Sequence, residues 1–183
     1  MQQFIKSQEP GISNVFSPNQ NLDWSNVVRP RSSSLFSQIN TEDGPKQVWT
    51  TFGPDQIDLN WHNPKITLEF LNLIITYLSN GIKWFRLDAV GFIWKESGTT
   101  CLHLPKAHSI VKLLRVLLNN LLNDGVLITE TNVPQKENLS YLIPDNEAHM
   151  AYNFPLPPLL LEAIITSRAD ILNLSLIHIS EPT

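Results

Sequence analysis

The stretch that decides the fold reads IKWFRLD at residues 82–88. It is short, rich in aromatic and apolar residues and bounded by glycines, which is the pattern of a β-strand. Side chains alternate along a strand, so Arg86 and Asp88 are predicted on one face, with Phe85 and Leu87 on the other. The apolar pair suits a face covered by helices. The opposite face then carries a cation and a carboxylate at the carboxyl end of the strand.

Helical patterns flank this strand on both sides. Upstream, Asn63 can cap a helix that begins at Pro64, and apolar residues then recur every three or four positions until Gly81. Downstream, a second helical pattern leads into a second strand, VLITET at residues 126–131. The remaining predicted elements are a strand at residues 148–154 and a helix from residue 157 or 158 to about residue 168.

Strands that alternate with helices indicate an α/β protein with a parallel sheet. Residues 1–60 are rich in Pro, Ser, Asn and Asp, and we expect them to be irregular, with short strands at most. A complete eight-stranded α/β barrel needs about 250 residues. The rest of this chain has room for only three such units. It is therefore either a small open sheet or a piece of a larger barrel, whose uncovered edges would favour aggregation.

Composition excludes several classes of protein. Of the 183 residues, 13 are Lys or Arg and 17 are Asp or Glu, so no dense basic face for nucleic acid is expected. Cys101 is the single cysteine, which argues against a disulfide scaffold and fits the cytoplasm. The five histidines lack metal-ligand spacing, so no metal site is predicted. No apolar run approaches the roughly 18 residues that cross a membrane.

Glu130 closes the second strand as Asp88 closes the first. Neighbouring parallel strands would place these carboxylates side by side, and a pair about 5 Å apart is the geometry of a retaining glycosidase. An arginine beside an aspartate, as with Arg86, favours the carboxylate form that a nucleophile needs. A structural ion pair at Asp88 and an exposed acid at Glu130 remain open alternatives.

Three further candidate site residues lie within residues 1–60. Arg29 and Arg31 flank a proline, and two stiffened cations can clamp an anion, although solvated loop arginines would look the same. Asp58 precedes the first helix, where it can support a turn.

FRLDAV at residues 85–90 and ITE at residues 128–130 resemble motifs of the α-amylase superfamily of retaining glycoside hydrolases and transglycosidases. QIDLN at residues 56–60 resembles the superfamily segment that precedes the strand bearing the nucleophile. The resemblance covers residues 25 to 170 and is strongest to the sucrose phosphorylase branch. Further stretches that carry it are residues 29–31, 48–52, 88–92, 95–101 and 152–159.

The resemblance implies a (β/α)8 TIM barrel. Residues 1–60 would belong to a subdomain inserted between barrel strands 3 and 4, and residues 61–172 would form about strands 4 to 6. Residues 173–183 match nothing in the family and are expected to be a non-native tail.

The resemblance also implies roles for individual residues. Asp88 would be the nucleophile, Glu130 the acid and base, and Arg86 the residue that orients the nucleophile. Asn132 stands where sucrose-specific members carry a histidine, which points to a different acceptor, as in relatives that act on glucosylglycerate. The other implied roles are a border of the glucose pocket for Phe52 and phosphate binding for Arg31 or Arg29. Asp58 would either be structural or support residues that touch the substrate.

The expected function is that of a retaining α-glucoside phosphorylase acting on sucrose or a glucosylglycerate-like substrate. Inorganic phosphate would be the co-substrate, and neither a metal nor an organic cofactor is implied. A homodimer is an open expectation for the full-length protein. An amylase-type hydrolase is one alternative. An inactive fragment is another, because the superfamily's His-Asp motif, which supplies a third catalytic carboxylate, has no counterpart in the chain.

Overall fold

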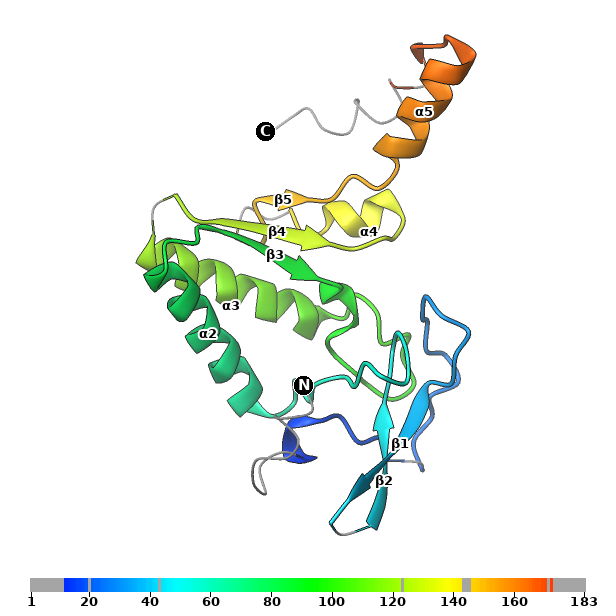
Figure 1. Ribbon diagram of the computed structural model, residues 1–183, viewed down its shortest axis with the longest axis vertical. Helices are drawn as coiled ribbons and strands as arrows, with labels where there is room; N and C mark the ends of the chain where they lie inside the picture. The colour runs from blue at the N-terminus through cyan, green and yellow to red at the C-terminus, as the bar shows by residue number, and fades with distance from the viewer. Residues whose placement is uncertain are drawn as a thin grey trace.

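The computed structural model describes residues 12–19, 21–42, 44–122, 124–142, 146–170 and 172. A parallel three-stranded sheet forms its centre, in the order β3-β4-β5, and an antiparallel hairpin, β1-β2, lies at one end (Figure 1). The strands are β1 (Phe36–Thr41), β2 (Gly44–Trp49), β3 (Trp84–Asp88), β4 (Val126–Glu130) and β5 (Met150–Ala151). The helices are η1 (Ile12–Asn14), α2 (Pro64–Ser79), η2 (Val90–Phe92), α3 (Pro105–Leu121), α4 (Gln135–Leu139) and α5 (Leu156–Thr166).

Helix α2 starts and stops where its sequence signals predict. Asn63 Oδ1 accepts a hydrogen bond from the backbone N–H of Lys65 at 3.1 Å, and Pro64 occupies the first turn. Gly81 follows the helix with φ at 83°, a left-handed conformation that glycine adopts at little cost.

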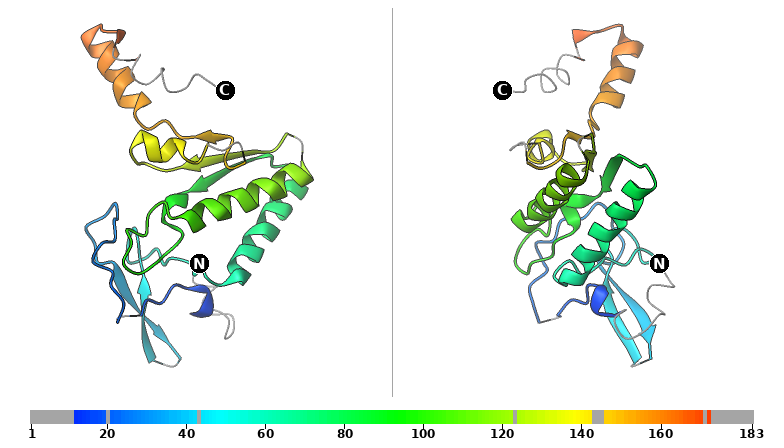
Figure 2. Two further views of the ribbon diagram at one scale, coloured as in Figure 1. Left: turned by 180° about the vertical axis from the view of Figure 1, so that it is seen from behind. Right: turned by 90° about the vertical axis from the view of Figure 1, so that its left-hand side faces the viewer.

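The main core lies between the sheet and the helices α2 and α3, which cover one face of β3 and β4 (Figures 1 and 2). Phe85 and Leu87 point into this layer, as the alternation along β3 predicts. Full burial of such side chains stabilises the fold by about 1.5–3 kcal/mol each. The buried members of the cluster are Ile74, Phe85, Leu114, Leu118 and Leu127.

The register of β3 and β4 places Asp88 directly opposite Glu130. Both predicted strands are confirmed, and both end in these acids. The prediction of a third strand over residues 148–154 is wrong in length, because only Met150–Ala151 pairs with β4. The N–H of Tyr152 still donates to the carbonyl of Thr129 at 3.0 Å, but the carbonyl of Tyr152 accepts from the side chain of Asn138.

The first sixty residues contain a hairpin that periodicity did not reveal. Trp49, which is 1% exposed, forms its core and contacts other aromatic rings edge to face. Those rings belong to Phe16, Trp24 and Phe36, with centroids 5.1–5.5 Å from that of Trp49. The division of the chain at residue 60 stays a prediction, and the predicted tail at 173–183 lies outside the described residues.

Apolar side chains remain uncovered at the two flanks of the sheet. Trp84 on β3 is 61% exposed, and helix α5 projects away from the rest with Ile164 and Ile165 68% and 73% exposed (Figures 1 and 2). The sheet is therefore open at its edges, as expected of a piece of a barrel. No helix in the described part of the chain is both long and apolar enough to cross a bilayer.

Candidate active site

Arg86, Asp88 and Glu130 converge at the carboxyl ends of β3 and β4. One guanidinium nitrogen, Nη2 of Arg86, lies 3.5 Å from Oδ1 of Asp88 and 3.5 Å from Oε1 of Glu130. The two carboxylate oxygens are consequently at most about 7 Å apart, a limit that includes the separation used by retaining glycosidases. Both acids therefore lie on one face of the sheet and close enough to act on one atom.

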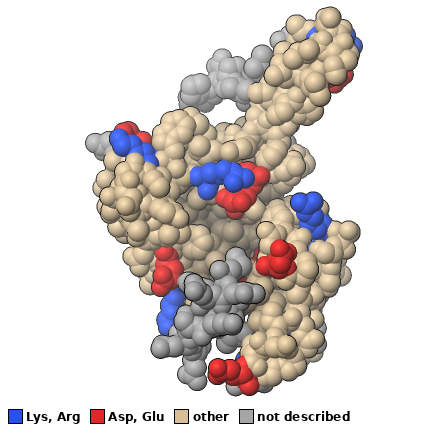
Figure 3. Space-filling model, in the orientation of Figure 1, with Lys and Arg blue, Asp and Glu red and all other residues tan. Residues whose placement is uncertain are grey.

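The two acids differ in how much of each side chain is exposed to solvent. The side chain of Glu130 is 19% exposed, whereas that of Asp88 is 70% exposed and that of Arg86 is 44% exposed. Ion pairs this open to solvent contribute only about 0–1 kcal/mol to folding. A purely structural role therefore gives little reason for three charges to meet at this edge, and the arrangement favours a binding or catalytic one. Near the centre of the face drawn in Figure 3, a basic patch adjoins an acidic patch, with uncharged residues around them.

Ala89 adds a backbone donor to this group. It follows Asp88 directly, adopts the left-handed conformation with φ at 49°, and donates its N–H to Oε2 of Glu130 at 3.2 Å. A left-handed alanine is strained, and such residues cluster at functional sites. Sequence reasoning missed this contact, since a backbone amide leaves no signature in residue type.

Tyr152 brings the third strand into the site. Its ring lies beneath Arg86, with the guanidinium carbon 5.3 Å from the ring centroid, a cation–π contact. Tyr152 follows β5, so three consecutive strands contribute to one cluster. Tyr152 appeared in the sequence analysis only as part of a family motif.

Phe52, Asn132 and Arg31 are three other predicted site residues. Among the described residues, no hydrogen bond or ion pair joins them to Asp88 or Glu130. Phe52 packs its ring edge to face on Phe92, 5.5 Å between centroids, and Asn132 and Arg31 are exposed. Their roles stay predictions.

Arg29 is engaged by the protein itself. Its Nη2 donates to the carbonyls of Thr50 at 3.3 Å and Thr51 at 3.2 Å, and to the hydroxyl of Ser33 at 3.0 Å. Its Nη1 donates to the carbonyl of Ser33. Arg29 thus fastens the loop that carries Arg31 to the end of β2.

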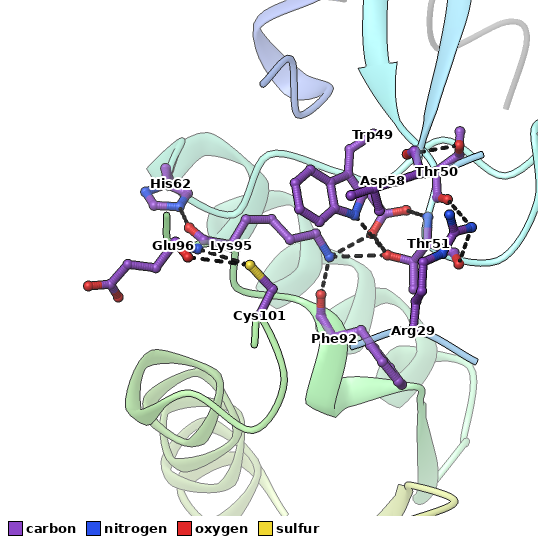
Figure 4. A network of polar contacts seen from close by, with 11 residues as sticks. Arg29, Trp49, Thr50, Thr51, Asp58, His62, Phe92, Lys95, Glu96 and Cys101 are labelled. Atoms are coloured by element: carbon purple, nitrogen blue, oxygen red, sulfur yellow. Dashed lines mark hydrogen bonds and ion pairs between the residues drawn. The ribbon is translucent and has the colours of Figure 1, made fainter. Parts of the chain in front are cut away.

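Asp58 is held by contacts with Thr51 and Lys95. Its Oδ1 accepts from the N–H of Thr51 at 2.9 Å, and its Oδ2 lies 2.7 Å from the ammonium of Lys95 (Figure 4). Burial lowers the pKa of the Lys95 ammonium, and the charge of Asp58 opposes that shift. Within the described ranges, no three His, Cys, Asp or Glu side chains gather as a metal site requires.

Two histidines, His103 and His108, contact buried side chains. His108 Nδ1 lies 2.8 Å from the buried Glu147 and its ring stacks on Tyr141. His103 Nδ1 contacts the hydroxyl of Tyr141 at 2.9 Å, and burial is the main cause that lowers the pKa of this imidazole.

Comparison with known proteins gives a consistent result. Residues 30–178 match the alpha amylase catalytic domain family. The chain is 46% identical over 160 residues to the glucosylglycerate phosphorylase of Escherichia coli, covering 86% of this chain and 29% of that protein. It is 48% identical over 149 residues to the glucosylglycerate phosphorylase of Allomeiothermus silvanus, covering 81% and 27%.

Solved structures show the same fold. The sucrose 6F-phosphate phosphorylase of Thermoanaerobacter thermosaccharolyticum aligns over 90% of this chain and 36% of its own, with a TM-score of 0.73 and 22% identity. The trehalose-6-phosphate hydrolase of Bacillus licheniformis aligns over 94% and 36%, with a TM-score of 0.63 and 15% identity.

The fold and the paired carboxylates define a segment of an α/β-barrel catalytic domain. The chain belongs to the alpha-amylase catalytic domain family. It spans about a quarter to three tenths of the length of the glucosylglycerate phosphorylases that it matches.

Proposed function

We propose that the full-length protein is a retaining α-glucoside phosphorylase and that this segment supplies barrel strands 4 to 6. The observation that carries the proposal is the shared contact of Arg86 with Asp88 and Glu130, which brings two carboxylates to one face with the contacting oxygens at most about 7 Å apart. The relatives that are 46–48% identical are named glucosylglycerate phosphorylases, which favours phosphorolysis over hydrolysis. Phosphate is then a co-substrate, and the reaction needs neither a metal nor an organic cofactor.

The first half of the reaction forms a glucosyl ester on Asp88. An oxygen of Asp88 attacks the anomeric carbon, the glycosidic C–O bond breaks, and Glu130 gives its proton to the departing oxygen. Arg86 faces both acids and orients the nucleophile. Ala89 fixes one oxygen of Glu130, which leaves the other to serve the leaving group.

The second half transfers the glucosyl group to phosphate. Glu130, now ionised, takes the proton of the attacking phosphate hydroxyl, and the ester bond to Asp88 breaks as the new C–O bond forms. Two inversions at one carbon give α-glucose 1-phosphate with net retention. Of the two arginines assigned to phosphate, Arg31 is the better candidate, because Arg29 already donates to backbone carbonyls.

The glucosyl donor in this proposal is glucosylglycerate rather than sucrose, so glycerate is the group that departs. Asn132 lies two residues after Glu130, where the resemblance places a histidine in sucrose-specific members. A pocket bordered by Phe52 would hold the glucosyl ring. We place the reaction in the cytoplasm, which suits the free thiol of Cys101.

The test is product analysis with the full-length protein, since the family's third carboxylate has no counterpart in this chain. Glucosylglycerate and sucrose are each incubated with and without inorganic phosphate, and α-glucose 1-phosphate, glucose and glycerate are quantified. We expect phosphate-dependent glucose 1-phosphate from glucosylglycerate, in the α configuration by proton NMR before mutarotation. Free glucose formed at the same rate with and without phosphate would instead identify a hydrolase.

A further inference from the structure

Lys95 is a lysine buried within the protein, in the loop between β3 and α3. Its side chain is only 2% exposed, yet each of its three N–H donors has an acceptor. These are Oδ2 of Asp58 at 2.7 Å, Oγ1 of Thr51 at 3.4 Å and the carbonyl of Phe92 (Figure 4). The ammonium also lies 5.4 Å from the ring centroid of Trp49. Lys95 is thus fully satisfied and held in one position.

The acceptors belong to two separate parts of the chain. Asp58 and Thr51 come from the segment that follows β2, whereas Phe92 belongs to η2, which follows the strand that ends in Asp88. Phe52, beside Thr51, packs on the ring of Phe92 with centroids 5.5 Å apart. The one ammonium therefore fixes the segment bearing Phe52 against the turn that leaves the paired acids.

The hydrogen bonds of Thr51 extend this arrangement. Thr51 Oγ1 donates to Asp58 Oδ2 at 2.7 Å and accepts from the indole N–H of Trp49 at 3.0 Å. The carbonyl of Thr51 accepts from Arg29 at 3.2 Å, and Arg29 fastens the loop that carries Arg31. A continuous set of contacts therefore runs from Lys95 through Thr51 to the predicted phosphate loop.

Stability alone does not account for such a pair. Buried ion pairs lose much of their Coulomb energy to desolvation, and well-packed neutral replacements are often as stable. What charges with directed hydrogen bonds add is a fixed geometry. We propose that Lys95 is a positioning residue of the glucosyl pocket, which holds Phe52 and the Arg31 loop in register with Asp88 and Glu130. This inference rests on the proposed function.

The test compares neutralised pairs in the full-length protein. Lys95→Met alone leaves Asp58 unpaired and can fail to fold, so the decisive variant is Lys95→Met with Asp58→Asn, which removes both charges and keeps an acceptor for the Thr51 N–H. The matched control is Lys83→Met with Asp124→Asn, an exposed pair at the opposite end of β3. Thermal unfolding first establishes that both double variants are folded.

We expect the Lys95/Asp58 variant to raise KM for the glucosyl donor and for phosphate by about tenfold or more, a loss of about 1.4 kcal/mol in binding, because Phe52 and the Arg31 loop are no longer held in place. The kcat should change less, because strand pairing still holds Asp88 and Glu130 together. The control should keep both parameters. A folded Lys95/Asp58 variant with wild-type KM values would overturn the inference.

Two further readouts separate this inference from the proposed function. Hydrolysis of α-glucosyl fluoride without phosphate gives a donor KM even if the protein proves to be a hydrolase. Hydrogen exchange needs no turnover: peptides covering residues 49–53 should exchange faster in the Lys95/Asp58 variant than in wild type, with β3 and β4 unchanged. Equal exchange in those peptides would refute a positioning role whatever reaction the protein catalyses.

Discussion

The assignment of separate roles to Asp88 and Glu130 predicts that neutralising them has different consequences. Asp88→Asn and Glu130→Gln each replace one carboxylate by an amide of the same shape. Both keep an oxygen acceptor, and in Glu130→Gln that oxygen can still receive the N–H of Ala89, which lies 3.2 Å from Oε2 in the wild type. The comparison therefore changes chemistry while leaving the local packing in place.

The size of the effect follows from the part that each acid plays. A general acid contributes about 100- to 10,000-fold, or about 3–5 kcal/mol, when the leaving group needs a proton. Glu130→Gln should lose that factor with glucosylglycerate. With α-glucosyl fluoride, whose leaving group departs without a proton, the first step should survive and the glucosyl-enzyme should accumulate. Asp88→Asn should lose activity with both donors, since no carboxylate remains to form the ester.

The assay combines kcat/KM for the two donors with mass spectrometry of the intact full-length protein. A glucosyl adduct is expected on Glu130→Gln with the fluoride, mapped by proteolysis to the peptide that contains Asp88. If Asp88→Asn retained the fluoride reaction while Glu130→Gln lost it, the roles would be reversed. Equal losses of kcat/KM with both donors in both variants would show that Asp88 and Glu130 do not have these separate roles.

Three further predictions concern folding, measured in the full-length protein. Gly125→Ala should lower the free energy of unfolding by about 1–3 kcal/mol, since its Cβ would lie 2.6 Å from Leu118 Cγ. Urea unfolding measures this change. Leu118→Ala should lower the free energy of unfolding less in the Gly125→Ala protein than in the wild type. Asn63→Ala removes the side chain that caps α2 by accepting from a backbone N–H at 3.1 Å. The free energy of unfolding should fall by about 1 kcal/mol, which lowers the Tm. An unchanged Tm would contradict this prediction. Burial, and then His108, lower the pKa of His103, so the unfolded state binds more protons and stability should fall as pH drops below about 6.5. His103→Gln should flatten that slope, and an equal slope would remove His103 as its cause.

The paired acids could be predicted from the sequence because the reasoning needed only local rules. Strand period and strand ends place Asp88 and Glu130, and parallel pairing makes their strands neighbours. The same rules placed Phe85 in the core, where it lies 8% exposed. The strand period and the strand ends depend on residues within a few positions of one another, and the pairing of the two strands follows from the strand–helix–strand order.

Other features could not be predicted because they depend on contacts between distant segments or on the backbone alone. Lys95 meets Asp58 across 37 positions of sequence, a meeting that no periodicity encodes. Ala89 acts through its amide and a left-handed φ of 49°. Helix α4 has five residues, too few to show a helical period, and the β1-β2 hairpin buries only the end of β2, so its alternation is weak.

The two arginines of the VRPR stretch at residues 28–31 show why residue type alone cannot separate an anchor from a ligand. Both are permanent cations, two positions apart around a proline, so the sequence alone does not show which of them binds an anion. What distinguishes them is the end of β2: the carbonyls of Thr50 and Thr51 face Arg29, and their hydrogen bonds engage its Nη2. Arg31 is exposed and, among the described residues, has no such acceptors. An anion bound by Arg29 would have to replace contacts that hold the loop, whereas one bound by Arg31 would leave them intact, so the fold itself assigns the anchoring role to one arginine and makes the other available.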